Sequence, residues 1–73
     1  MFGSKRSKLE AKVKHLNALR ASYRSELEEA ERLNRRREIS DEELERVRRR
    51  SHAKLEDLAE RIRAARAELE SVK

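Results

Sequence analysis

Apolar residues recur along this chain at steps of three and four positions, and the repeat changes phase once, near the middle. Such steps place side chains on one face of a helix that pairs with another helix in a coiled coil. A single unbroken helix would keep one phase throughout, so the change of phase predicts two helices. The first stripe is Leu9, Val13, Leu16, Arg20, Tyr23, Leu27, Ala30 and Asn34. The second stripe, with one doubled step of four after Ser51, is Leu44, Val47, Ser51, Leu55, Leu58, Ile62, Ala65, Leu69 and Val72.

The point where the chain reverses carries a capping signal and neither proline nor glycine. Proline is absent, and the single glycine is Gly3. Ser40 and Glu43 have the spacing of a capping box, in which each side chain bonds the other residue's backbone amide at the start of a helix. Ile39 and Leu44 occupy the two positions of a hydrophobic staple. These signals predict a helix over about 4–37, a turn at about 38–40 and a second helix over about 41–72, in one domain of residues 1–73.

Folding the chain back at this turn gives an all-α fold, an antiparallel two-helix hairpin of the coiled-coil type. Residues that face each other across such a hairpin have nearly constant summed numbers, and here the sum is 78. Leu9 then meets Leu69, and Leu16 meets Ile62. Three stripe positions are polar, and polar residues at such positions fix the register or the oligomeric state. They are Arg20, Asn34 and Ser51.

The apolar stripes are wider than an isolated pair of helices requires. Leu19 and Leu33 lie beside the first stripe. Ala53 and Ala59 lie beside the second, and three apolar positions per heptad are typical of four-helix bundles. We therefore predict a homodimer of hairpins, with a monomeric rod, a trimer and a complex with another helical protein as alternatives. The predicted core and oligomer residues are Leu9, Val13, Leu16, Leu19, Tyr23, Leu27, Leu33, Leu44, Val47, Leu55, Leu58, Ile62, Leu69 and Val72.

Positive charge is concentrated in the first third of the chain. Residues 1–25 carry seven Lys or Arg against one acid, Glu10, so we expect a basic stripe that nothing nearby neutralises. RNA, DNA or an acidic protein surface would be the partner of such a stripe, and a face that only maintains solubility is the other interpretation. The chain does not fit a basic leucine-zipper factor. The basic region of such a factor carries no core, whereas here Leu9 and Val13 begin the core inside the basic segment. The candidate polyanion-binding residues are Lys5, Arg6, Lys8, Lys12, Lys14 and His15.

The arginine runs at 35–37 and 48–50 are balanced by neighbouring carboxylates, because residues 26–73 carry thirteen bases and fourteen acids. The hairpin register places Glu28 and Glu29 across from two arginines of the second run. We therefore expect interhelical ion pairs, as flanking charges form in coiled coils. The expected pairs are Glu28 with Arg50 and Glu29 with Arg49.

The sequence contains no pattern that indicates an enzyme or a cofactor site. The two histidines, His15 and His52, would lie about 16 Å apart along the rod, too far to share a metal ion. There is no Gly-rich phosphate loop, and no apolar run is long enough to cross a membrane. We expect a non-enzymatic, cytoplasmic structural or adaptor protein that acts through self-association and protein binding, without cofactor, metal ion or small-molecule substrate. A small nucleic-acid-binding regulator is the alternative.

Residues 38–45 are similar to the start of the second helix in SHOCT domains, which are short helical modules linked with oligomerisation. The resemblance implies a helical module that self-associates. The long partner helices expected here depart from the size of that family, so we assign the chain to no family.

Overall fold

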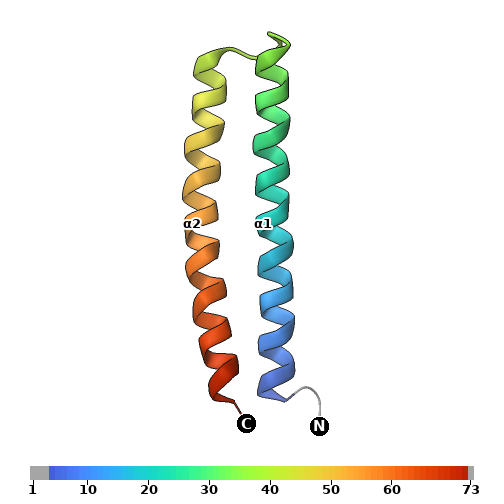
Figure 1. Ribbon diagram of the computed structural model, residues 1–73, viewed down its shortest axis with the longest axis vertical. Coiled ribbons are helices and arrows are strands. Elements are labelled where there is room, and N and C mark those ends of the chain that lie inside the picture. Colours follow the sequence, from blue (N-terminus) through green and yellow to red (C-terminus); the bar gives the residue numbers. More distant parts are fainter. Residues whose placement is uncertain (1–3, 73) are drawn as a thin grey trace.

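The structure, a computed structural model, describes residues 4–72 and consists of two long helices packed against each other. Helix α1 spans Lys5–Arg35 and helix α2 spans Asp41–Ser71. The helices run side by side in opposite directions, so the start of α1 and the end of α2 lie at the same end of the rod (Figure 1). The molecule measures 53 × 18 × 13 Å. The expected pair of long, mutually packed helices is confirmed.

Helix α2 begins at the predicted capping box, in which both hydrogen bonds are present. The backbone N–H of Glu43 donates to Ser40 Oγ at 3.1 Å, and the backbone N–H of Ser40 donates to Glu43 Oε1 at 3.1 Å. Leu44 is buried and Ile39 is half-buried, as expected for the two apolar positions that flank such a box. Negative charge in the first turn also stabilises a helix N-terminus, and Asp41 contributes to it.

Helix α1 ends in a Schellman motif, which closes a helix C-terminus with two backbone hydrogen bonds. The N–H of Arg37 donates to the carbonyl of Asn34 at 2.9 Å, and the N–H of Glu38 donates to the carbonyl of Leu33 at 2.8 Å. The motif places one residue in the left-handed region, usually glycine. Here that residue is Arg37, with φ 63°.

The helix ends differ slightly from those expected from the sequence. Helix α1 stops at Arg35 and not at 37, so the connection covers 36–40. The cause is the Schellman motif, which takes Arg37 out of the helical region. Because the left-handed residue is not a glycine, the sequence did not predict the motif. Helix α2 stops at Ser71, because Val72 is extended (φ −89°, ψ 123°).

The core is a single line of small and medium side chains between the two helices. Leu16, Leu58 and Ile62 form a buried cluster in it, against which the half-buried Leu19 and Tyr23 pack. No buried residue in the described range has more than one neighbouring helix to pack against, because there are only two helices in that range. The buried residues are Leu9, Leu16, Ala30, Leu44, Ser51, Leu58, Ile62 and Ala65.

The φ of Arg37 generates a prediction about stability. A side chain costs about 1–2 kcal/mol in the left-handed region, and glycine removes that cost while adding some entropy to the unfolded chain. Arg37→Gly should therefore stabilise the hairpin by about 0.5–1 kcal/mol, measured by urea or thermal unfolding.

Arg36→Gly is the matched control, because Arg36 has an ordinary φ of −85°. It should destabilise the hairpin by about 0.5–1 kcal/mol. Equal effects of the two substitutions would contradict the assignment of strain to Arg37.

Candidate interaction surfaces

The apolar seam between the helices remains partly open to solvent along the length of the rod. Five of the residues predicted to form it are buried, namely Leu9, Leu16, Leu44, Leu58 and Ile62. The other nine are half-buried, and together with Ile39 and Ala59 they are called here the half-buried apolar stripe. These nine are Val13, Leu19, Tyr23, Leu27, Leu33, Val47, Leu55, Leu69 and Val72.

The two alanines expected beside the second stripe differ in position. Ala59 is half-buried and belongs to the half-buried apolar stripe, whereas Ala53 is exposed. Ala53 follows the buried Ser51 by two residues, which is about 200° around a helix, so it faces away from α1. The expectation that Ala53 widens the seam was wrong.

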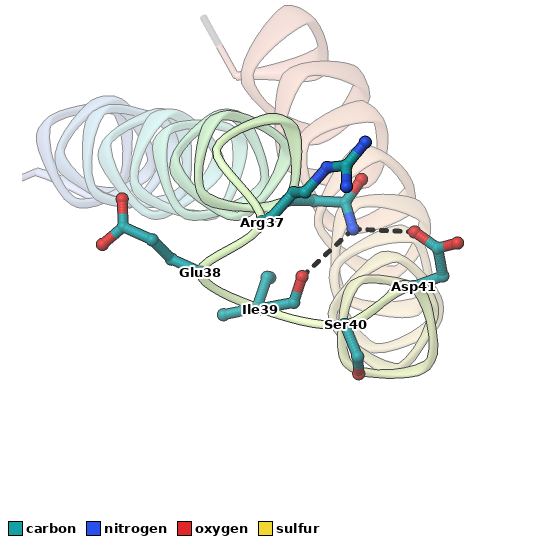
Figure 2. A pocket seen from close by; sticks show the side chains of 6 residues that line it. Arg37, Glu38, Ile39, Ser40 and Asp41 are labelled. Atoms are coloured by element: carbon teal, nitrogen blue, oxygen red, sulfur yellow. Dashed lines mark hydrogen bonds between the residues drawn. The ribbon is translucent and has the colours of Figure 1, made fainter.

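Asn34 connects the end of α1 to the start of α2. Its Nδ2 atom donates to the carbonyl oxygen of Ile39 at 3.3 Å and to Oδ1 of Asp41 at 2.8 Å. Both hydrogen bonds cross a shallow pocket at the turn, lined also by Arg37, Glu38 and Ser40 (Figure 2). This polar seam residue therefore fixes the geometry of the turn.

Ser51 and Asn17 each bury a polar atom without a partner. Ser51 has 1% of its surface exposed, and its Oγ makes no hydrogen bond within the described residues. The Oδ1 atom of Asn17 is likewise buried and unbonded in that range. A buried hydroxyl without a partner costs about 1–3 kcal/mol, so Ser51 weakens the hairpin in which it sits.

Three ion pairs join the helices at positions that flank the seam. An Arg50 guanidinium nitrogen lies 2.6 Å from Glu26 Oε1, and an Arg48 guanidinium nitrogen lies 3.5 Å from Glu31 Oε2. The third pair joins Lys5 to Glu68 at the end of the rod where α1 begins and α2 ends, which is called here the open end. These side chains are more than one third exposed, so each pair contributes at most about 1 kcal/mol.

The ion pairs expected for Glu28 and Glu29 were wrong. Arg50 pairs with Glu26, and Arg49 pairs with Glu45 of its own helix. Glu29 instead pairs with Arg32, also within one helix. The register gave the correct level along the rod, but Glu28 and Glu29 lie on the outward face of α1. Glu26 is seven residues from Leu19 and from Leu33, so it lies beside the seam with them.

The predicted basic stripe is partly neutralised, contrary to expectation. The ammonium of Lys5 lies 3.6 Å from Glu68, which α2 brings to it, and Arg6 lies 3.8 Å from Glu10 one turn away. All six candidate polyanion-binding residues are exposed. Within residues 4–72, the four of them without an ion-pair partner are Lys8, Lys12, Lys14 and His15.

No group of three or more metal-ligating side chains occurs within residues 4–72. A hollow on the outer side of α2 is shallow and is lined largely by the exposed Ala64 and Ala67, with charged side chains around them. Over the same range, neither helix combines the length and the apolarity that crossing a membrane requires.

Comparisons with protein-family models, with curated proteins and with solved structures found no match to this chain.

The hydrogen bonds of Asn34 generate a second prediction. Asn34→Ala removes both bonds across the turn, one of them to a carboxylate, and should destabilise the hairpin by about 1–2 kcal/mol in urea unfolding. Asn17→Ala is the control, because the carbonyl oxygen it removes bonds to none of the residues that the structure describes. That variant should be neutral or slightly stabilising, and an equal loss in both variants would contradict a special role for Asn34.

The buried hydroxyl of Ser51 generates a third prediction. Ser51→Ala should stabilise the hairpin by about 1 kcal/mol or more, because alanine has no hydroxyl to desolvate and a higher helix propensity. Ser25→Ala tests the propensity effect alone at an exposed position and should gain about 0.5 kcal/mol. Thermal unfolding measures both, and a gain at position 51 no larger than that at 25 would show that the hydroxyl costs nothing.

Proposed function

We propose that this chain is a non-enzymatic structural or adaptor module that acts by associating with itself. Two hairpins pack their half-buried apolar stripes together and form a four-helix bundle. The observation that carries this proposal is the partial exposure of the seam at nearly every level of the rod, from Val13 near the open end to Leu33 near the turn.

The surface area of the hairpin supports association. The chain exposes 6043 Å², whereas a compact protein of 8.7 kDa exposes about 4,700 Å². The excess of about 1,300 Å² is larger than the roughly 800 Å² that each partner contributes to a standard protein interface. One hairpin therefore has enough additional surface to supply such an interface.

The half-buried leucines indicate which side of α1 the second hairpin would cover. Leu19 and Leu33 are 14 residues apart, which is two heptads, so they lie on the same side of α1 and about 21 Å apart along its axis. Leu19 also packs against the buried cluster of Leu16, Leu58 and Ile62. A second hairpin that covers this side extends the existing core and does not have to build a new one.

A second copy fits this surface better than an unrelated helix does. The stripe runs the length of the rod, and a two-fold axis would place every part of it against the same surface of the partner. The charges that flank the seam are largely satisfied within one hairpin, as in the pair of Arg50 with Glu26. Apolar contact therefore provides the main attraction.

Sedimentation equilibrium over micromolar to submillimolar concentrations tests the proposal. We expect a species of twice the mass of the 8.7-kDa chain. Leu19→Ser with Leu33→Ser should weaken the dimer on the order of 100- to 1,000-fold, because four half-buried leucines per dimer each lose about 1 kcal/mol of burial.

Ala18→Ser with Ala21→Ser is the matched control, since both alanines are exposed on α1. It should lower the helix stability similarly and leave the dimer intact. A monomer at every concentration, or a trimer, contradicts the proposed bundle.

A further inference from the structure

Positive charge is segregated along the rod as well as along the sequence. The half of the rod that contains the chain ends, residues 4–21 and 57–72, has nine bases and five acids, a net charge of +4. The half that contains the turn, residues 22–56, has ten bases and ten acids and is neutral. The excess charge of the described residues therefore lies at the open end.

Three lysines carry most of this excess. Lys8, Lys12 and Lys14 are exposed, and none of them takes part in an ion pair within the part of the chain that the structure describes. Glu10 is the one acid in the first 25 residues, and it is already 3.8 Å from Arg6. Among residues 4–72, therefore, no carboxylate is paired with any of the three ammonium groups.

The acids of α2 at this end are also accounted for. Glu68 is bound by Lys5, and Asp57 is bound by Arg61 at 3.1 Å. Glu60 and Glu70 are exposed, and their heptad positions face away from α1. The lysines thus remain available to a partner that carries negative charge.

The arrangement of these lysines around α1 suits a ligand with two lines of charge. At about 100° per residue, Lys8 and Lys14 lie on opposite flanks of the outward face of α1, with Ala11 and Ala18 between them, and Lys12 lies about 40° beyond Lys8, beside the seam. Both alanines are exposed. Their small side chains allow the helix backbone to approach a surface closely while lysines extend on both sides.

Duplex DNA presents such lines of charge, because its two phosphate strands border each groove. A helix is about 10–12 Å across, which matches the roughly 12 Å width of the major groove.

The major groove of duplex RNA is too narrow and deep for such a helix. Single strands are bound by stacking on aromatic side chains, and Tyr23, the one aromatic residue in the described range, is half-buried in the seam. A membrane surface requires a free apolar helix face, whereas the outward face of α1 carries Lys14 and the small residues Ala11 and Ala18.

We propose that the outward face of α1, with Lys8 and Lys14 on either side of Ala11 and Ala18 and Lys12 at its edge, binds the phosphate backbone of duplex DNA across the major groove. Alanine and lysine supply no paired donors and acceptors for base edges, so binding is independent of sequence. The centre of this site lies on the face opposite the seam and does not require the self-association proposed above. Lys12 is seven residues from Leu19, so it lies on the side of α1 that the proposed dimer covers, and sedimentation of each variant separates an effect on the dimer from an effect on DNA binding.

Fluorescence anisotropy with a labelled 24-base-pair duplex tests the proposal on the whole chain. We expect binding at micromolar protein in low salt, equal for two unrelated sequences. Each neutralised phosphate contributes about −0.9 to the slope of log K against log salt, so three lysines predict a slope of about −2.7 or steeper. A fourfold rise in salt should then weaken binding roughly 40-fold or more.

Lys8→Gln, Lys12→Gln and Lys14→Gln together should reduce the affinity at least tenfold and flatten the salt slope by about 2.7. The control replaces Arg35, Arg46 and Arg49 with Gln, which removes the same charge from exposed positions at the neutral half of the rod. It should change the affinity less than threefold. Circular dichroism and sedimentation of both variants verify that the helices and the oligomeric state are unchanged.

Four results would overturn the proposal. One is the absence of binding to the duplex at low salt, and another is equal weakening by the two triple variants, which would show an effect of net charge alone. The third is equal or tighter binding to a single strand or to duplex RNA of the same length. The fourth is lysine-dependent binding to anionic lipid vesicles at the same concentration as to DNA, which would assign the face to a membrane.

Discussion

Two helices can cover each other along only one stripe, and this geometric limit shapes the whole protein. Each buried side chain has the opposite helix on one side and solvent nearby on two others. Only small and medium residues are therefore buried, and larger ones such as Tyr23 remain partly exposed. The hairpin consequently has a thin core and a wide apolar margin, which is the basis of the proposed dimer.

Hydrogen bonds at the turn hold the two helices together in addition to the packing of the thin core. The Schellman motif at Arg37, the bonds from Asn34 and the capping box at Ser40 all lie within the same few residues. At the open end, Lys5 and Glu68 form an exposed ion pair, and Ser4 accepts a hydrogen bond from the N–H of Ser7. The rod is thus fixed at one end and held mainly by packing at the other, where we expect hydrogen exchange to be faster.

Much of the fold could be predicted from periodicity and capping. The phase change located two helices, and the spacing of Ser40 and Glu43 located the start of α2, because both signals are local and have a direct physical cause. The end of α1 was missed by two residues, since a non-glycine residue at positive φ leaves no trace in the sequence. Arg37 is that residue.

The surfaces were harder to predict than the fold. Summed residue numbers give the level of a residue along the rod but not the side of the helix on which it lies, so Glu26 was overlooked in favour of Glu28. The pairing of Lys5 with Glu68 was missed for a related reason, because a long side chain reaches across several levels. Ion pairs between exposed chains depend on such reach, whereas buried apolar contacts depend on periodicity alone.

The uneven charge of the rod has a consequence for how two copies can lie together. Parallel hairpins would bring two halves of charge +4 side by side, at separations comparable to the screening length of about 8 Å in physiological salt. Antiparallel hairpins instead place the like-charged halves at opposite ends of an assembly about as long as one 53 Å rod. This separation is far larger than the screening length. In the proposed dimer, Coulomb repulsion would therefore favour the antiparallel pairing, in which each basic half adjoins the neutral half of its neighbour.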